Sequence, residues 1–268
     1  MMEAFGSTHH EESVARAHVE VLNRIDLKRY GEHMALKSTS FAPAPGGMLR
    51  HSCNEQLSRH THKDPFAAIV VRGSYLEAGD RGRIRVVPGD VILHGPFESH
   101  SDEFSESGAE VLILPFESKD LSSPLARVRD PDGIARISKH DMREAISVLE
   151  EQLQAVQSQF FDWPDQLAHD LQHRPSFPLS VWAEKKNLRQ ETLSRGFRRV
   201  FGVTPQAFRA RSRLLRAVGR VRQGEQLSQV ARCCGFADQS HLTREFRALI
   251  GVPPGCWQRG EMIDPNEK

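Results

Sequence analysis

The sequence has no run of 18 apolar residues, the length that a membrane-spanning helix requires. Its 268 residues include only four cysteines and no CxxC pair, which excludes a zinc ribbon and a ladder of disulfides. The first residues, MMEAFGSTHHEE, lack the basic start and apolar stretch of a secretory signal. We therefore expect a cytoplasmic protein that does not enter a membrane. The cysteines are Cys53, Cys233, Cys234 and Cys256.

Motifs of the common catalytic sites are also missing. The chain has no glycine-rich phosphate loop, no GxSxG nucleophile elbow and no HExxH zinc motif. Cys233 and Cys234 fall on the core side of an expected helix, so neither thiol is predicted to be an activated nucleophile. These absences favour a protein that is not an enzyme.

The net charge of +1 conceals two halves of opposite charge. Residues 1–171 hold 18 Lys and Arg against 27 Asp and Glu, a net charge of −9, whereas residues 172–268 hold 18 against 8, a net charge of +10. This asymmetry indicates that a polyanion such as nucleic acid would bind only the second half. A solvated basic surface is the alternative, and charge alone does not separate the two.

The first half predicts an extension followed by short strands. We assign residues 1–40 no function; both disorder and an extension upstream of a start at Met34 fit them. Between Met48 and Phe116, β-branched runs alternate with Gly and Pro, a spacing typical of a small antiparallel barrel or jelly roll. The expected strands cover residues 66–73, 74–78, 83–87, 91–94 and 110–116.

A helical pattern follows the strands. Apolar residues recur at spacings of 4, 3, 4, 3 and 4 from Met142 to Phe160, which predicts a linker helix within residues 137–160. Its apolar stripe could pack on its own domain or pair with a second copy in a homodimer. The spacing is compatible with both.

An internal repeat in the basic half is the most informative feature of the sequence. LSRGFRRVFGVTP at 193–205 aligns with LTREFRALIGVPP at 242–254, and seven of thirteen positions are identical. Each copy lies in a pattern of short helix, tight turn and longer helix, over 179–201 and 227–249. The expected turn residues are Asn187 and Gly235, and the expected helix caps are Ser180, Ser228 and Asp238.

A helix-turn-helix can bind DNA because its second helix fits the major groove and presents its early residues to base edges. Arg suits guanine, Gln suits adenine, Ser or Thr suits several bases, and an Arg one turn later suits phosphate. The alternative is a helical protein-interaction domain with a solvated basic face. The predicted base contacts are Gln190, Glu191, Ser194 and Arg195 in the first unit and Gln239, Ser240, Thr243 and Arg244 in the second, and the predicted phosphate contacts are Arg198, Arg199 and Arg247.

These motifs resemble the DNA-binding domain of the AraC/XylS family of transcription regulators. The resemblance covers residues 163–260 and rests on the two repeated segments, on GFADQSHLTREFRALIGVPP at 235–254, and on the joining helix QAFRARSRLLRAV. It implies two recognition helices held so that one monomer contacts two successive major grooves. Arg189 departs from the family, which usually has a small hydroxyl residue there, so the first recognition helix is expected to begin poorly capped.

The joining helix adds a stripe of arginines opposite an apolar side. The stripe could contact DNA phosphates, or it could be structural and pair with Glu184 or Glu245. Its members are Arg209, Arg213, Arg216 and Arg220.

The Met48–Phe116 segment resembles a cupin barrel. The likeness implies that His60, His62 and His100 surround one divalent metal such as zinc or nickel, since residues two apart on a strand share a face. The Glu that metal-binding cupins commonly place after HxH is absent, and an organic effector or a barrel that only supports dimerisation is the alternative. The resemblance rests on His60-Thr61-His62, Gly73, Pro88-Gly89-Asp90, Pro96 and His100; the spare donors are His94, Glu98 and Asp102.

The sequence thus predicts an α+β multidomain chain with an N-terminal cupin-like β-barrel (jelly roll) at 41–120, a helical linker and a C-terminal all-α double helix-turn-helix domain. The predicted function is a sequence-specific transcription regulator that binds double-stranded DNA and senses a small molecule or a metal. The alternative is a metal-dependent cupin enzyme, an isomerase or dioxygenase. A DNA-architectural protein fits less well, because no apolar wedge accompanies the groove positions.

Overall fold

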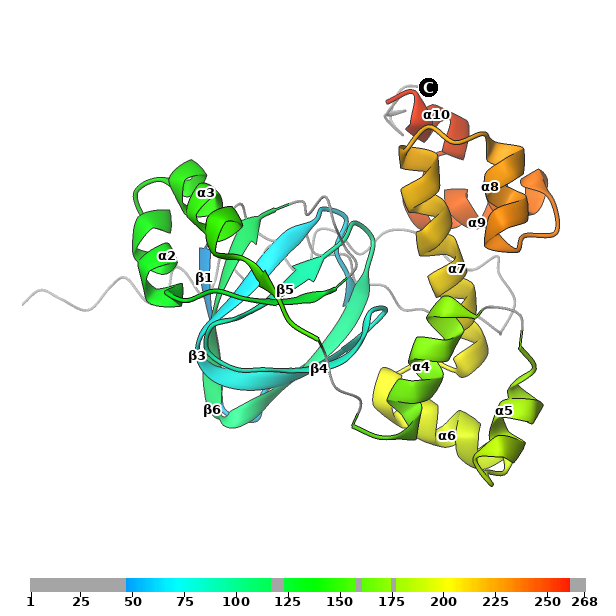
Figure 1. The fold of residues 1–268 in the computed structure, drawn as a ribbon, viewed down its shortest axis with the longest axis horizontal. Coiled ribbons are helices and arrows are strands. Elements are labelled where there is room, and N and C mark those ends of the chain that lie inside the picture. The colour runs from blue at the N-terminus through cyan, green and yellow to red at the C-terminus, as the bar shows by residue number, and fades with distance from the viewer. Residues whose placement is uncertain (1–46, 117–122, 158–160, 175–176, 261–268) are drawn as a thin grey trace, which may run out of the picture.

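The computed structural model describes residues 47–116, 123–157, 161–174 and 177–260. The expectations for residues 1–40 and for Phe160 lie outside these ranges. An antiparallel sheet with helices α2 and α3 forms one part of the molecule, and helices α4 to α10 form the other (Figure 1). Among the described helices, none is both long enough and apolar enough to span a membrane.

The sheet is built on two long strands, β3 (Phe66–Gly79) and β6 (Ser99–Pro115), that pair with each other over most of their length. β6 also pairs with β1 and β2, whereas β3 also pairs with β4 and β5. The remaining strands continue the sheet from β5. Their bounds are β1 Gly47–His51, β2 Gln56–Thr61, β4 Gly82–Val86, β5 Asp90–His94, β7 Leu125–Arg127 and β8 Gln154–Ala155.

The described strands form an open sheet, so the predicted closed jelly-roll barrel is not what they make. The strand order runs β1-β6-β3-β5-β7-β8, and within the described residues no ladder joins β1 to β8. The strands expected at 66–73 and 74–78 are one strand, β3. Gly73 adopts a φ of 69°, which bends the strand at this position but does not end it.

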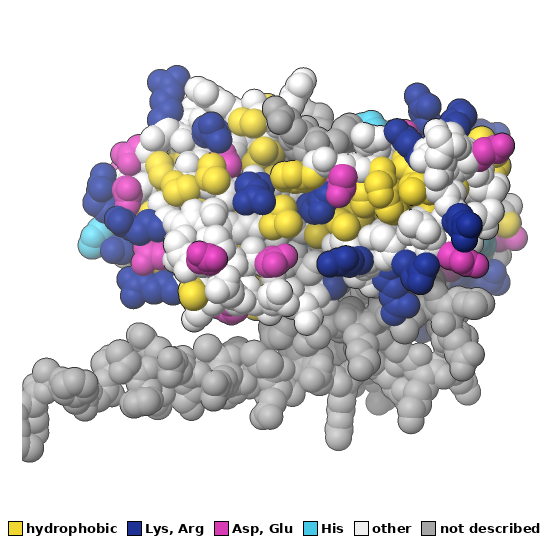
Figure 2. Space-filling view, turned by 90° about the horizontal axis from the view of Figure 1, so that it is seen from below, with side chains coloured by type: hydrophobic (Ala, Val, Ile, Leu, Met, Phe, Trp, Pro, Cys, Tyr) yellow, Lys and Arg dark blue, Asp and Glu magenta, His cyan; other side chains and the backbone are white. Residues whose placement is uncertain are grey.

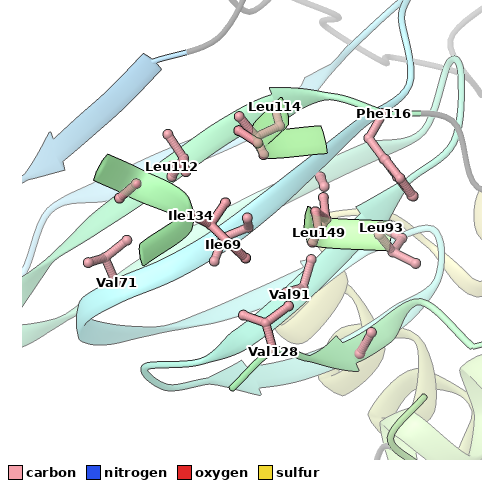
Figure 3. Close-up of a cluster of buried hydrophobic side chains, with 14 residues drawn as sticks. Ile69, Val71, Val91, Leu93, Leu112, Leu114, Phe116, Val128, Ile134 and Leu149 are labelled. Carbon is pink, nitrogen blue, oxygen red and sulfur yellow. The ribbon is translucent and has the colours of Figure 1, made fainter. Parts of the chain in front are cut away.

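Two apolar layers cover the faces of the sheet, as the alternation of side chains along β3 requires. Ile69 and Val71 pack against helices α2 (Pro131–Ser138) and α3 (Met142–Gln152), as Figure 3 shows. Phe66 and Val70 belong to the layer on the other face.

The linker helix predicted within residues 137–160 is shorter than expected. α3 ends at Gln152, and Gln154–Ala155 form β8 against β7. Leu149 is fully buried, and Met142 and Ile146 pack beside it on the sheet. The described part of the apolar stripe therefore packs within the chain, and the homodimer stays a prediction.

The basic half forms two small cores at the two ends of one long helix, α7 (Pro205–Arg222). The first core includes the aromatic side chains of Phe197, Phe201 and Phe208, and the second includes Phe246. The helices of the first core are α4 Trp163–His173, α5 Leu179–Lys185 and α6 Gln190–Phe201; those of the second are α8 Leu227–Cys234, α9 Gln239–Ile250 and α10 Pro254–Gln258.

The sheet contacts both helical cores. Ala78 of β3 is part of the first core, and Phe97, in the loop between β5 and β6, is part of the second. Arg83 of β4 also pairs with Asp162 at 2.6 Å and Asp165 at 3.0 Å, at the start of α4. The two parts of the chain are thus joined by apolar and ionic contacts.

Gly73 provides a test of the bend in β3. A Cβ atom there would lie 2.0 Å from the carbonyl oxygen of Gly108 in β6, and φ is positive. We expect Gly73→Ala to lower the free energy of unfolding by at least about 2 kcal/mol in chemical denaturation, because backbone cannot yield as a side chain can. Gly219→Ala is the control, since an added Cβ meets nothing within 4 Å in the exposed face of α7; it should stabilise by up to about 1 kcal/mol. Equal effects would contradict the bend.

Candidate functional site

The first candidate DNA-binding unit is the helix pair α5 and α6. Asn187 adopts a φ of 52° between the helices, the left-handed conformation expected at this turn. Leu193 and Phe197 are buried and fix the inner face of α6. The outer face carries the predicted contact residues, all of them exposed: Gln190, Glu191, Ser194, Arg195, Arg198 and Arg199.

The second unit, α8 and α9, has the same construction. Gly235 ends α8 with a φ of 79°, and Asp238 caps α9 by accepting a hydrogen bond from the amide of His241 at 2.7 Å. Thr243 is half-buried, and its hydroxyl donates to the carbonyl oxygen of Gln239 at 2.9 Å, within its own helix. The other predicted contact residues are exposed: Gln239, Ser240, Arg244 and Arg247.

The starts of the four helices agree with the sequence only in part. Arg189 makes no capping hydrogen bond at the start of α6, as predicted. The expected caps Ser180 and Ser228 are wrong, because each serine is the second residue of its helix; the N-cap positions belong to Pro178 and Gln226. Of the two recognition helices, only α9 therefore begins with a side-chain cap.

Figure 2 looks at the molecule from the end where α5 and α6 lie. Dark blue Lys and Arg side chains lie at both ends of this face, and those at the right of the view lie over the helical part. The positive charge of α6 comes from arginine: Arg195, Arg198 and Arg199 are all exposed in this helix. The first recognition helix thus carries positive charge on its outward side.

The arginine stripe of α7 braces the two cores. Arg209 donates to the carbonyl oxygen of Phe177 at 2.8 Å and lies over its ring, and Arg213 lies over the ring of Phe236. Arg216 donates to the carbonyl of Gln172, and Arg220 pairs with Glu225 at 3.0 Å. These partners differ from the predicted Glu184 and Glu245, and they give the stripe a structural role; its contact with DNA phosphates stays a prediction.

A cluster of histidines occupies the strands β2 and β6. His60 is paired in register with His100, and the Nε2 atoms of the two rings are 2.9 Å apart. The Nε2 atom of His62 is 3.1 Å from that of His100. His62 and His100 are buried, and His60 is partly exposed. The three histidines predicted from the HxH spacing and the cupin likeness therefore do lie together.

Acidic and basic groups behind His100 complete the cluster. Glu77 Oε2 lies 3.1 Å from His100 Nδ1 and 3.4 Å from His94 Nε2, and Asp102 Oδ1 lies 3.9 Å from His100 Nδ1. Glu98 lies apart from the cluster, with its carboxylate toward the Gly95 amide and Arg81. The sequence alone did not indicate Glu77. This residue of β3 is paired in register with Asp102 of β6, and the pairing brings it close to His100.

Burial and neighbouring charge divide the histidines into two kinds. Burial, with the nearby His100, lowers the pKa of His60 to about 4. Burial also opposes the charged form of His100, but Asp102 and Glu77 outweigh it and raise its pKa to about 9. Burial likewise disfavours the ionised form of Glu77, yet His94 and His100 outweigh it and hold the pKa of Glu77 well below its usual range.

The donor set fits a divalent transition metal. Three imidazole nitrogens at this mutual spacing match bonds of about 2.0–2.1 Å to one ion, and zinc and nickel both accept imidazole. The ligand atoms of His60, His62 and His100 all lie within 4.8 Å of one another, and so do those of Glu77, His94 and His100. Because His100 belongs to both sets, Glu77 is placed to orient its ring from behind.

A family of helix-turn-helix domains matches residues 182–260, which include α5 from Trp182 onward and the whole of α6, α8 and α9. The transcriptional activator RhaS of Pectobacterium carotovorum is 34% identical over 73 residues, 27% of this chain and 26% of RhaS. The transcriptional regulator GbdR of Pseudomonas aeruginosa is 24% identical over 263 residues, 94% of this chain and 64% of GbdR. Unsaturated fatty acid bound ToxT from Vibrio cholerae shows 12% identity with a TM-score of 0.37, over 80% of this chain and 94% of ToxT.

In RhaS and GbdR the matched stretch is less than two thirds of the relative's length. Both relatives are regulators of transcription, and the family match covers the two helix pairs described above except for the start of α5. These findings show that residues 182–260 are similar to a family of helix-turn-helix domains and that the chain is similar to known regulators of transcription.

Proposed function

We propose that the chain regulates transcription by binding double-stranded DNA through a double helix-turn-helix, with α6 and α9 in successive major grooves. One observation carries the proposal: two helix pairs of equivalent construction lie at the two ends of α7. Each pair has a left-handed turn residue, Asn187 or Gly235, and a second helix whose outward side is polar. A protruding helix of this kind fits the major groove.

Equivalent positions of α6 and α9 offer equivalent chemistry. The repeat aligns Gln190 with Gln239, and Arg195 with Arg244, at an offset of 49 residues. These side chains are exposed, and they suit adenine and guanine edges respectively. Serine and threonine accompany them at Ser194, Ser240 and Thr243, and Glu191 can accept from cytosine; Arg198, Arg199 and Arg247 are placed for phosphate.

We infer a sensor domain and a DNA-binding domain from the same arrangement. The sensor comprises residues 41–120 together with α2 and α3, because these helices pack on the sheet. The DNA-binding domain comprises residues 163–260, with helix-turn-helix units at 179–201 and 227–249. The net charge of +10 after residue 171 supports contact of the second domain with DNA.

Arg244 tests the base contacts of α9. The full chain first selects a duplex from a random library. Arg244→Ala should then weaken binding to that duplex by about 1–3 kcal/mol, and the preference for one base should relax at one position. Fluorescence anisotropy against the selected duplex and its single-base variants measures both effects. The affinity of the unmodified chain should also fall steeply with salt, by about 0.9 log units per neutralised phosphate.

Two arginines serve as controls for this experiment. Arg247→Ala should weaken binding to all sequences alike if Arg247 contacts phosphate. Arg143→Ala removes the same charge from the exposed face of α3, on the sheet, and should leave affinity unchanged. A library selection that enriches no sequence would contradict the proposal, and an equal loss on every duplex would make Arg244 a phosphate contact.

We propose further that the sheet part is a cupin-like sensor and that His60, His62 and His100 hold a divalent transition metal. The support is the meeting of three Nε2 atoms at a partly exposed edge of a buried cluster. A bound ion would offer an effector group or water an open coordination position. Glu77 would hold the Nδ1 side of His100, which leaves Nε2 available for the metal.

A metal-dependent enzyme is the other use of such a centre. We infer a sensor instead, because the relatives are named as a transcriptional activator and a transcriptional regulator. The double helix-turn-helix would then be the output of the chain, and an effector or the metal itself its input.

Metal analysis of the full chain tests the centre. After equilibration with zinc chloride and removal of unbound ion, the chain should retain about one zinc. The double variant His60→Ala with His62→Ala should lose that zinc if His60, His62 and His100 are its ligands, because only His100 of the three remains; zinc kept by the double variant would assign it to Glu77, His94 and His100 instead. The control is His140→Ala with His173→Ala, which removes two exposed histidines and should leave the content unchanged. Equal zinc in all three proteins would refute the centre.

A further inference from the structure

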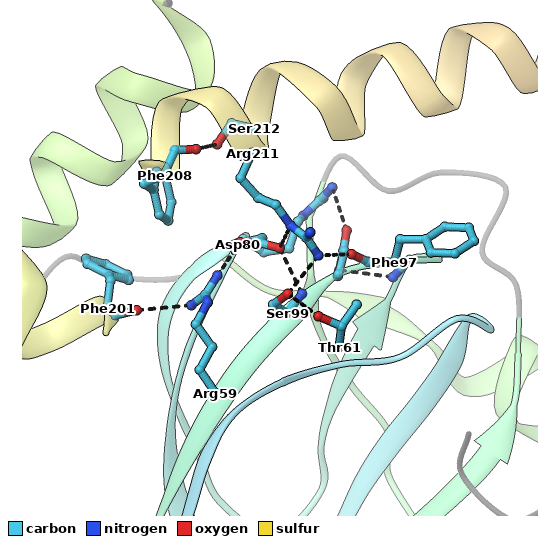
Figure 4. Close-up of polar contacts among 12 residues, drawn as sticks. Arg59, Thr61, Asp80, Phe97, Ser99, Phe201, Phe208, Arg211 and Ser212 are labelled. Carbon is cyan, nitrogen blue, oxygen red and sulfur yellow. Dashed lines mark hydrogen bonds and ion pairs between the residues drawn. The ribbon is translucent and has the colours of Figure 1, made fainter. Parts of the chain in front are cut away.

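The two strands that carry the histidine cluster have an opposite face with a different use. His60 is in register with His100, and Thr61 with Ser99, so successive pairs point to opposite sides of the β2–β6 ribbon. Thr61 and Ser99 are buried and share a hydrogen bond of 2.6 Å between their hydroxyls. On this side the ribbon meets α7, as Figure 4 shows.

Arg211 of α7 docks on that opposite face. Its Nε atom donates to Asp80 Oδ2 at 3.0 Å, and its Nη2 atom donates to Ser99 Oγ at 2.7 Å and to the carbonyl oxygen of Phe97. The side chains of Asp80 and Arg211 are 1% and 9% exposed. We call Asp80, Phe97 and Ser99 the Arg211 seat.

Arg59 of β2 binds the same carboxylate and reaches the other core. One of its terminal nitrogens pairs with Asp80, and the other donates to the carbonyl oxygen of Phe201 at 3.1 Å, where α6 ends. Arg59 and Thr61 flank His60 in the sequence, so one short strand serves the histidines on one side and α6 and α7 on the other.

Phe97 links the seat to the histidines through the backbone. Its amide donates to the carbonyl oxygen of His62 at 2.8 Å, and the amide of His62 lies 3.3 Å from the carbonyl oxygen of Glu98. Phe97 has a φ of 62°, an uncommon conformation for a large side chain, and its ring packs in the second core, 5.7 Å from the ring of Trp257. Strained residues of this kind persist where their surroundings hold them from several sides.

We propose that the Arg211 seat couples the histidine centre to the DNA-binding helices: an ion bound by His60, His62 and His100 fixes the β2–β6 ribbon and the Phe97 loop, and thereby fixes α7 on the sheet. The coupling rests on the proposed metal centre. The coupling is reciprocal by thermodynamic necessity. If the metal strengthens the contact of α7 with the sheet by some factor, loss of that contact lowers the affinity for the metal by the same factor. A centre without this connection would bind metal independently of α7.

Zinc titration of the full chain against a competing chelator tests the coupling. Arg211→Met should lower the affinity for zinc at least about five-fold relative to the unmodified chain. The variant should fold, because Asp80 keeps Arg59 and the amide of Ser99 as partners. Arg220→Met is the matched control; Arg220 lies on the same helix and pairs with Glu225, away from the sheet, so its zinc affinity should not change.

A second variant acts through the loop instead of the ion pair. Phe97→Gly keeps the positive φ and removes the ring from the second core, and it too should lower the affinity for zinc. Hydrogen exchange provides an independent measurement: zinc should slow exchange of the α7 amides in the unmodified chain and in Arg220→Met, but not in Arg211→Met.

The possible failures are distinct. Zinc bound equally by the unmodified chain, Arg211→Met and Phe97→Gly, with no change in α7 exchange, would overturn the coupling and leave the metal centre standing. An unmodified chain that binds no zinc would overturn the centre and the coupling together, while the DNA experiment above would still decide the role of α6 and α9.

Discussion

The relative position of the two parts depends on one buried carboxylate. Asp80 lies in the turn between β3 and β4, and its side chain is almost completely withdrawn from water. A buried charge is tolerated only when it is paired and hydrogen-bonded, and removing one partner typically costs about 3–5 kcal/mol. Arg59, the Ser99 amide and Arg211 supply those partners from β2, β6 and α7. Arg211 belongs to the helical part. Separating the two parts would therefore remove one partner of Asp80 and leave its buried charge less well paired.

The helical part could be predicted from sequence because its signals are local. The repeat fixes the spacing of the buried faces, and left-handed residues at Asn187 and Gly235 mark the turns where they were expected. Gly202 and Gly251 end α6 and α9 with φ values of 71° and 92°. Each of these features needs only a few neighbouring residues, so no knowledge of the rest of the fold was required.

The sheet was harder because its polar strands bury their polar side chains. The first half of β6 reads SHSDEFSESG, which has the composition of a loop, yet His100, Asp102 and Phe104 alternate into the buried face. Glu77 resembles a solvent-facing residue of an ordinary strand and is 4% exposed. Only the pairing of β3 with β6 places it beside His100. Likewise, the arginines of α7 could be recognised as a stripe, but their carbonyl and aromatic partners come from distant segments.

Charge explains why the histidines and carboxylates are found together. The Nε2 atom of His100 lies about 3 Å from those of His60 and His62, and such neighbours cannot all be protonated, since like charges repel strongly in a buried site. The lowered pKa of His60 and the raised pKa of His100 favour a proton on His100 over a proton on His60. The carboxylates of Glu77 and Asp102 both face His100, and burial raises the pKa of Asp102 to about 6. A divalent ion on His60, His62 and His100 would bring further positive charge close to these two carboxylates, which is electrostatic support for the metal centre that we propose.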